Sequence, residues 1–459
     1  MPELLRASLE LSLEDSKRHL PFVFSCPPGV GVLTLRWSFD PPGAAELRTL
    51  ITLSLHGPEG LQGGGFRGAG HRHGTLHEVT LTAGSATPGY LAGPIPAGEW
   101  TVTLHTHLVV GRTRGELVVS APDEPAREVL PAAPVSQPPM SQPAVSHPSL
   151  PRPAAFAGGW MMGDLHCHTR HSDGHWTPRE LAAAAVARGL SFLALTDHNT
   201  VSGREGLREA FPGVLLAGLE LTTFHGHALA LGVPSYLDWT PLEPGRGMGE
   251  LAAEVGGRGG VLTLAHPFAA GDPICTGCAW TYFDLRPENA THLEVWNGPW
   301  AGRHNDLSLA YWYTLLAAGH RVVATAGTDA HGPGYLPGVG FTCTPATSDS
   351  ATLLAQLREG RTYLGASACL KLTLTAPDGP VPLGGTGEAG RWTVALSWGD
   401  LPPGCTLVWV VDGRRQPEPL EAEGMRAVSV MVRSWVNLEI RGPDGDLLVL
   451  TNPGYARTE

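Results

Sequence analysis

The sequence has few charged residues, and cationic residues are the scarcer sign. Charged residues make up 16% of the 459 positions, and 31 Lys and Arg against 43 Asp and Glu give a formal net charge of -12. This balance argues against a general binder of nucleic acid or of anionic membrane surfaces. The sequence also lacks an apolar run of about 18 residues that could span a bilayer, and residues 1–20 lack the apolar core of a signal peptide. We therefore expect a cytoplasmic protein.

Cysteine is scarce as well. The seven cysteines are scattered and odd in number, which favours a reducing compartment over a disulfide framework. Cys275 and Cys278 form a lone C-x-x-C, which fits a redox pair or half of a zinc site. No second pair follows at zinc-finger spacing, so we expect two loop thiols. The G-x-S-x-G elbow of serine hydrolases is absent too, so no covalent serine nucleophile is expected.

Glycine and proline are abundant, with 59 and 41 residues, and they divide the chain. Short alternating strands between turn signals predict an N-terminal β-sandwich over residues 1–121 and a C-terminal β-sandwich over 366–459. The Pro-rich segment 122–157 has the composition of a stiff, extended linker. Residues 158–365 alternate between strand and helix patterns, which predicts an α/β domain.

Seven apolar runs in this α/β domain have the length of buried strands. They begin near residue 160 and continue at 190–196, 214–219, 227–233, 260–265, 291–296 and 322–327. Nearly every run has a residue able to bind metal at or beside one end. Parallel β/α units bring the carboxyl ends of their strands to one mouth, so sequence-distant ligands can share a site. The count predicts a barrel of about seven strands.

Histidine is concentrated in the same region, with twelve of the 20 between His166 and His331. On a strand, side chains two residues apart point the same way, so His166 and His168 can aim two imidazoles at one point. Asp173 can face back toward that point because Gly174 lets the chain turn. Imidazole with carboxylate is a ligand set for zinc, manganese or iron. A bare His-x-His fits two unrelated histidines at least as well, and the downstream motifs decide.

Five motifs in order resemble those of the PHP (polymerase and histidinol phosphatase) superfamily of metallohydrolases. They are His166-x-His168 with Asp173, Thr196-Asp197-His198, Gly218-Leu219-Glu220, Ala265-His266-Pro267 and Gly327-Thr328-Asp329-Ala330-His331. The resemblance covers about residues 160–365 and implies an α/β fold, a distorted (β/α)7 PHP barrel flanked by the N- and C-terminal β-sandwich domains. The flanking domains and the segment 294–298 resemble the branch that includes the CehA/McbA-type carbamate hydrolases.

By matching position, the resemblance implies two or three divalent metal ions (Mn, Zn or Fe). The ligands of the first ion would be His166, His168, Glu220 and Asp329. Glu220 would bridge to a second ion held with His266 and His227. Asp173, His198 and His331 would hold a third ion, or serve as acid/base groups and substrate contacts. His331 or His198 would protonate the leaving oxygen, and Asp197 would orient an imidazole.

The implied function is hydrolysis of a small phosphate mono- or diester by a metal-bridging hydroxide. Expected substrate contacts are Arg170, His171, Asn297 and Arg303, although ordinary solvated arginines fit as well. Two alternatives stay open. One is a carbamate or aryl-ester hydrolase with an aromatic wall from Trp280, Tyr282, Phe283, Trp296 and Trp300. The other is a glycan- or partner-binding protein with a structural metal site.

The expected partner is a small-molecule substrate, with no nucleic acid and no membrane. Three other histidines, His175, His225 and His304, are candidates to line the mouth of the site. We expect His292 and His320 at the surface or at helix ends, and His71, His73 and His77 in solvated loops.

Overall fold

The computed structural model describes residues 2–44, 47–60, 64–122, 159–300, 303–332, 334–336, 338–366, 370–399 and 401–457. They form two compact units. One contains the described residues up to 122 and the loop Arg170–Asp173, and the other contains the rest from residue 159. Apart from Pro122, the predicted Pro-rich linker 122–157 lies outside the described residues. In the described ranges, no helix combines the length and the apolar character that a membrane crossing requires.

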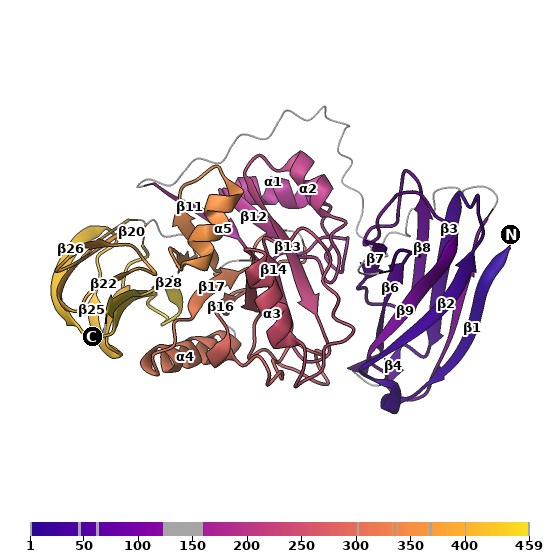
Figure 1. The fold of residues 1–459 in the computed structure, drawn as a ribbon. Helices are drawn as coiled ribbons and strands as arrows, with labels where there is room; N and C mark the ends of the chain where they lie inside the picture. Colours follow the sequence, from indigo (N-terminus) through magenta and orange to yellow (C-terminus); the bar gives the residue numbers. More distant parts are fainter. Residues whose placement is uncertain are drawn as a thin grey trace. The chain divides into compact units, whose positions relative to one another are not determined.

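The N-terminal unit is a sandwich of two four-stranded antiparallel sheets, β1-β10-β3-β8 and β2-β9-β6-β7 (Figure 1). The strands are β1 Glu3–Leu11, β2 Arg18–Cys26, β3 Val32–Asp40, β4 Gly43–Ala44, β5 Leu47–Arg48, β6 Leu50–His56, β7 Phe66–Gly70, β8 Leu76–Thr82, β9 Gly98–Leu108 and β10 Thr113–Ser120. Alternate apolar side chains such as Trp37, Leu53 and Trp100 fill the core. The expectation of solvated loops is wrong for two of its three histidines. His71 and His77 are buried, and His77 belongs to β8.

All seven strands predicted for the α/β domain are present. They are β11 Trp160–Asp164, β12 Phe192–Leu195, β13 Val214–Thr222, β14 His227–Leu231, β15 Val261–Leu264, β16 His292–Asn297 and β17 Val323–Gly327. They form one sheet in chain order. The pairs β11–β12, β12–β13, β15–β16 and β16–β17 are parallel, whereas β14 runs antiparallel to both neighbours. Most of these strands therefore bring their carboxyl ends to one edge.

The regular strand–helix alternation of a (β/α)7 barrel is only partly present. The five α-helices of the described residues are α1 Pro178–Arg188, α2 Arg204–Ala210, α3 Met248–Gly257, α4 Arg303–Ala317 and α5 Ser350–Arg358. The capping box predicted for α1 is confirmed, since Thr177 Oγ1 accepts from Glu180 N at 3.1 Å and Thr177 N donates to Glu180 Oε2 at 2.7 Å. No described helix separates β13 from β14, which form a hairpin, and between β15 and β16 there is only a 3-10 turn, Pro287–Asn289.

The curled sheet is not closed by a strand ladder between β17 and β11. The free edge of β11 instead pairs antiparallel with β18 Phe341–Pro345, and the sheet continues through β19 Tyr363–Gly365 to β28 Leu447–Thr451. Beyond the carboxyl ends of β11 and β17 the backbones do meet. Asp329 N donates to His166 O at 2.8 Å, and His168 N donates to Ala330 O at 3.0 Å. Gly327 permits this approach, because a Cβ there would lie 2.2 Å from His166 Cβ.

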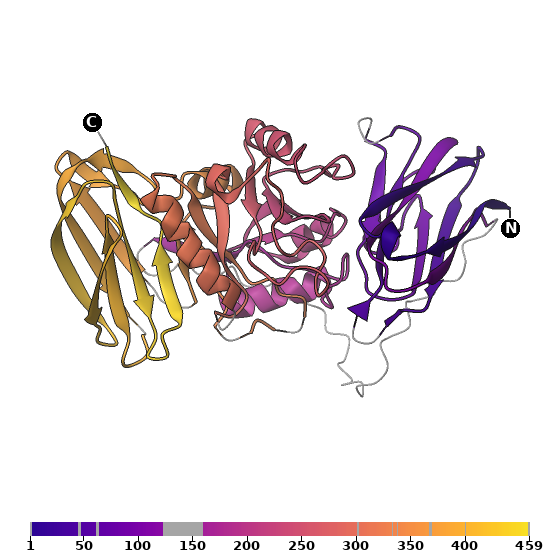
Figure 2. The same cartoon turned by 90° about the horizontal axis from the view of Figure 1, so that it is seen from below.

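The C-terminal residues form a second sandwich, one sheet of which continues the central sheet. Its strands are β20 Leu370–Ala376, β21 Gly379–Val381, β22 Thr386–Glu388, β23 Gly390–Trp398, β24 Thr406–Val411, β25 Arg414–Pro419, β26 Gly424–Val432, β27 Trp435–Arg441, β28 Leu447–Thr451 and β29 Gly454–Arg457. Helix α4 runs beside these strands (Figure 2), and Tyr313 on α4 donates to Glu439 on β27 at 2.6 Å.

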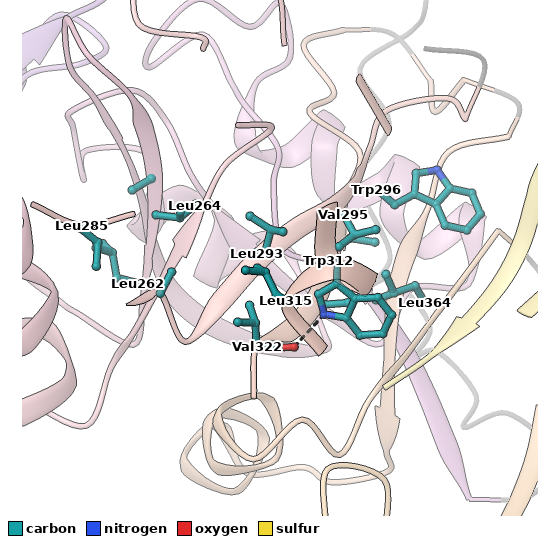
Figure 3. Close-up of a cluster of buried hydrophobic side chains, with 14 of the residues drawn as sticks. Leu262, Leu264, Leu285, Leu293, Val295, Trp296, Trp312, Leu315, Val322 and Leu364 are labelled. Atoms are coloured by element: carbon teal, nitrogen blue, oxygen red, sulfur yellow. Dashed lines mark hydrogen bonds between the residues drawn. The ribbon is translucent and has the colours of Figure 1, made fainter. Parts of the chain in front are cut away.

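The core behind the site joins α4 to the central sheet. Leu293 and Val295 point from β16 toward Trp312 and Leu315 on α4, and all four are buried (Figure 3). The indole of Trp312 donates to Val322 O at 2.7 Å, which satisfies its one polar atom. This packing fixes the outer side of β16 and β17, whose ends carry functional groups.

Candidate metal centre

The carboxylate of Glu220 is the centre of the site. Glu220 lies near the end of β13 and is fully buried. Its Oε2 lies 2.8 Å from His198 Nδ1 and 3.5 Å from Nε2 of both His166 and His168. Its Oε1 lies 3.1 Å from His227 Nδ1 and 3.3 Å from His266 Nε2. Five predicted ligands from four segments of the chain thus converge on one carboxylate.

The β13–β14 hairpin explains how His227 reaches this point. Its register pairs Thr222 with His227, so the start of antiparallel β14 lies beside the carboxyl end of β13. The hydroxyl of Thr223 closes the turn by donating to Gly226 O at 2.7 Å. A helix at this position would carry the chain away from the mouth, whereas the hairpin returns a second ligand to it.

The first ligand segment is oriented by a residue that the sequence-based site did not include, Glu294 on β16. His166 Nδ1 donates to Glu294 Oε1 at 2.9 Å, which leaves Nε2 directed at Glu220 and Asp329. Glu294 Oε2 accepts from His266 N at 2.9 Å and from Asn297 Nδ2 at 3.0 Å. A carboxylate behind a metal-binding imidazole fixes its tautomer and raises its basicity. The sequence signal was an acid inside an otherwise apolar strand.

Asp329 and His331 form the more exposed side of the site. The side chain of His331 is 37% exposed and that of Asp329 is 26% exposed, whereas those of His166 and His168 are fully buried. Asp329 Oδ1 lies 3.1 Å from His168 Nε2 and 3.4 Å from His166 Nε2. A substrate approaching from solvent would meet His331 and Asp329 first.

Four overlapping groups of side chains have donor atoms that all lie within 4.8 Å of one another. The groups are His166, His168 and Glu220; His166, His266 and Asp329; His168, Asp173, His198 and His331; and His227, His266 and Cys278. Every predicted metal ligand belongs to at least one group. In the described part of the chain, Nε2 of His166 and Nε2 of His168 are buried without a hydrogen-bond partner. Buried imidazole nitrogens that converge with carboxylates fit divalent cations.

The electrostatics of the site favour ionised carboxylates. Burial raises the pKa of Glu220, but the nearby imidazoles of His198 and His166 outweigh it and hold that pKa well below its usual value. Burial likewise raises the pKa of Asp329, and His166 and His168 reverse the effect. Burial and the neighbouring imidazoles lower the pKa of His168 to about 3, so its lone pairs are available at neutral pH. These are the forms that bind a cation.

His166 shows the opposite shift. Burial lowers its pKa, but the carboxylates of Asp329 and Glu294 outweigh burial and raise the pKa well above its usual value. The negative field of the site therefore attracts a proton to His166 when no other cation is present. A divalent ion would compete for the same field and displace that proton.

The remaining predicted residues lie at or outside these groups. Asp197 accepts from Thr169 N at 2.7 Å and from Thr169 Oγ1 at 2.8 Å, so it fixes the turn after His168, and among the described residues it joins none of the four groups. Asn297 Nδ2 lies 3.4 Å from Asp329 Oδ2, at the site's edge. Arg303 is exposed at the first residue of α4.

Two further predicted contacts lie on the loop Arg170–Asp173. Arg170 is exposed, and His171 is half-buried, with burial lowering its pKa to about 4. The structure brings neither into a donor group within the described residues. Their roles as substrate contacts stay predictions.

Other sequence-based expectations need correction. Cys275 and Cys278, expected as two loop thiols, are joined in a disulfide. His292, expected at the surface, is buried in β16, where its Nε2 lies 3.1 Å from Leu357 O. Trp296, expected in an aromatic wall, is fully buried and packs edge-to-face on Trp300 in the hydrophobic core.

Comparison with known proteins shows what part of this chain is similar to. Residues 164–248 match the model of the PHP domain. The matched segment includes His166, His168, His198, Glu220 and His227, which are members of the donor groups. The match over residues 164–248 and the donor groups together support a metal-dependent hydrolase.

Individual relatives share parts of the chain. An uncharacterised protein of Methanocaldococcus jannaschii is 27% identical over 151 residues, which are 30% of this chain and 82% of that protein. A 3',5'-nucleoside bisphosphate phosphatase of Chromobacterium violaceum is 38% identical over 79 residues, 15% of this chain and 27% of that enzyme. A solved two-domain protein of Bacteroides vulgatus, which contains a predicted PHP-like metal-dependent phosphoesterase, is 18% identical, with 68% of this chain and 100% of that one covered and a TM-score of 0.37.

Proposed function

We propose that this chain is a metal-dependent phosphoesterase that hydrolyses a small phosphate mono- or diester. The observation that carries the proposal is the buried Glu220 carboxylate, which has imidazole nitrogens of five histidines within 3.5 Å. A buried carboxylate can be held by protonated partners for structure alone. The open side at Asp329 and His331 instead favours a site that admits a ligand.

The donor groups support two or three divalent ions of manganese, zinc or iron. His166, His168, Glu220 and Asp329 would hold one ion, and His227 and His266 would hold a second with Glu220 between them. Asp173, His198 and His331 would hold a third ion, or would serve as acid/base groups and substrate contacts if only two ions bind. Bound divalent ions lower the pKa of water to about 7 and polarise a phosphoryl oxygen.

The chain's own groups supply the proton transfers and the orientation. His331 Nδ1 donates to Asp329 O at 2.8 Å, so exchange of a proton with substrate takes place at Nε2. His331 is the most exposed histidine of its donor group, which favours it as the acid that protonates the leaving oxygen. His198 is buried, with Nδ1 beside Glu220, and this favours a ligand role. Asn297 is in position to orient substrate or the Asp329 carboxylate.

A carbamate or aryl-ester hydrolase is the second candidate, and with it membership of the CehA/McbA-type branch. The observation in its favour is an aromatic surface near His227. Trp280 and Tyr282 lie 5.2 Å apart between ring centroids, and Tyr282 packs on His225 at 5.9 Å. Phe283 is 60% exposed. Because Tyr282, Trp296 and Trp300 are all buried in the core, the exposed aromatic surface is smaller than the sequence suggested, and we favour the phosphoester.

The experiment is a substrate panel on protein loaded with Mn²⁺ or Zn²⁺. The panel contains p-nitrophenyl phosphate, bis(p-nitrophenyl) phosphate, a short oligonucleotide and an aryl N-methylcarbamate. We expect turnover of an aryl phosphate, its loss on chelation, and its loss in Glu220→Gln. Glu254→Gln, an exposed glutamate of α3, is the matched control and keeps wild-type activity.

Each other result decides against the proposal. Turnover of the carbamate alone would transfer the assignment to the second candidate. Turnover of the oligonucleotide alone would make the substrate a nucleic acid. Metal binding without turnover of any member would favour the binding-protein alternative.

A further inference from the structure

The loop that carries Cys275 and Cys278 lies against the two histidines that contact Glu220 Oε1. Each histidine has one ring nitrogen toward Glu220 and the other toward this loop. His227 Nδ1 faces Glu220, whereas its Nε2 is buried and has no hydrogen-bond partner in the described ranges. His266 Nε2 faces Glu220, and its Nδ1 lies 3.4 Å from Cys278 O.

The sulfur of Cys278 completes a donor group with these histidines. Its Sγ and a ring nitrogen of each of His227 and His266 all lie within 4.8 Å of one another. Gly277 makes the approach possible. Its φ is +82°, and a Cβ there would lie 2.0 Å from Thr223 O and 3.2 Å from His227 Nε2. No other residue type fits so close to the imidazole.

Backbone contacts on both sides fix the position of Cys278. Ala279 forms a bridge with Phe268, and Trp280 N donates to Pro267 O at 3.1 Å, which ties the loop to the segment after His266. Thr281 N donates to His225 O at 2.7 Å, which ties it to the β13–β14 turn. The sulfur is therefore held beside both imidazoles by contacts that do not involve the disulfide.

We propose that the Cys275–Cys278 pair is a redox switch of the metal centre, in which the reduced Cys278 thiolate joins His227 and His266 as a ligand. The inference rests on the metal centre of the proposed function. A thiolate is a strong ligand for zinc, whereas a sulfur engaged in a disulfide carries no anionic charge for a cation. Oxidation therefore withdraws one ligand without moving the loop.

The switching reaction is thiol–disulfide exchange with a low-molecular-weight disulfide. One cysteine thiolate attacks the small disulfide, forms a mixed disulfide and releases one small thiol. The other cysteine attacks the mixed disulfide, forms Cys275–Cys278 and releases the second small thiol. Two electrons pass from the pair to the small disulfide, and the two cysteine protons leave with the released thiols. Cys275 and Cys278 are half-buried beside the exposed Asp272 and Pro273, so the pair is accessible.

The same ligand would set metal preference. Thiolates favour zinc over manganese, whereas imidazole and carboxylate ligands accept both. We therefore expect reduced protein to prefer Zn²⁺ over Mn²⁺ more strongly than oxidised protein does. The loss of this ligand is expected to weaken Zn²⁺ binding by at least about 10- to 100-fold, the range seen when groups that only support a ligand are lost.

The test measures Zn²⁺ affinity and Co²⁺ absorption in wild type, Cys278→Ser and Cys275→Ser, each reduced and each treated with oxidised glutathione. Mass spectrometry checks that wild type loses two hydrogen atoms on oxidation. Cys275→Ser is the matched control, since it keeps the ligand and removes only the switch. We expect a sulfur-to-cobalt charge-transfer band in reduced wild type and in Cys275→Ser whose Cys278 carries no bound glutathione by mass spectrometry. Oxidised wild type and Cys278→Ser lack the band and bind Zn²⁺ more weakly.

Other outcomes overturn the proposal. One is unchanged Zn²⁺ affinity on oxidation, another is a Cys278→Ser variant that binds like reduced wild type, and a third is the same loss in both serine variants. Cys167 is no confounding ligand, because its buried thiol donates to Ala194 O on β12 and joins none of the donor groups within the described residues. Neither readout needs turnover, so a failed substrate panel leaves this result standing, and a flat affinity leaves the phosphoesterase proposal standing.

Discussion

Replacing Glu294 by glutamine tests whether the site depends on support from behind its ligands. The Glu294 carboxylate accepts hydrogen bonds from His166 Nδ1, His266 N and Asn297 Nδ2, at 2.9, 2.9 and 3.0 Å. All three partners are donors. A glutamine side chain has the same length but presents an NH2 group to one of them and carries no charge. A hydrogen bond to a charged group contributes about 1.5–3 kcal/mol. We therefore expect Glu294→Gln to weaken metal binding by about 10- to 150-fold.

The assay is competition for Zn²⁺ or Mn²⁺ against a chromophoric chelator, with circular dichroism to verify the fold. Asp284→Asn is the matched control. The Asp284 carboxylate also accepts two backbone N–H bonds, at 2.8 and 3.1 Å from Met248 and Gly249, but it belongs to none of the donor groups within the described residues. Wild-type metal affinity in Glu294→Gln would refute the reasoning, and so would an equal loss in Asp284→Asn.

Three further predictions concern stability. Burial lowers the pKa of His292 to about 4 from an ordinary 6.5. The free energy of unfolding should therefore fall by up to about 3 kcal/mol as the pH falls from 6.5 to 4. In urea unfolding, His292→Gln should show a flatter pH dependence of this free energy than wild type. Glu439→Gln should destabilise the second unit by about 2–3 kcal/mol in urea unfolding. This loss is smaller than for a fully buried ion pair, because the bidentate partner Arg415 is 42% exposed. Unchanged stability would contradict this prediction. If free metal is present at 100 times its Kd, chelation should lower the unfolding free energy of the metal-loaded second unit by about 2.7 kcal/mol. Identical melting with and without chelator would contradict a bound ion.

The sequence was most informative where an apolar run of strand length ends at a residue able to bind metal. The seven strands from β11 to β17 follow from apolar runs of the right length, and parallel strands bring their carboxyl ends together. That rule alone brings His166, Glu220 and Asp329 to one edge of the sheet. In the structure, His166 Nε2 lies 3.5 Å from Glu220 Oε2 and 3.4 Å from Asp329 Oδ1. The capping box of α1 was equally local and equally predictable.

Features that depend on tertiary context were not predictable. The β13–β14 turn carries no signal that separates a hairpin from a helical crossover, so the alternation was overestimated. Glu294 is an acid within a buried strand, and only its contact with His166, in the segment after β11, gives it a role. The Cys275–Cys278 spacing is compatible with several chemistries, and the approach of Gly277 to His227 became visible only in three dimensions.

Backbone strain and ligand support meet in the same residues. His266 and Asp329 both have left-handed backbone conformations, with φ of 29° and 50°. Such conformations of residues other than glycine cost on the order of 1–3 kcal/mol and persist only where their surroundings fix them. His266 N is fixed by Glu294, and Asp329 N is fixed by His166 O. Because Glu294 also fixes the imidazole of His166, one carboxylate stabilises both a strained backbone and the orientation of a side chain. Its removal should therefore loosen His166, which follows β11, and His266, which follows β15, together.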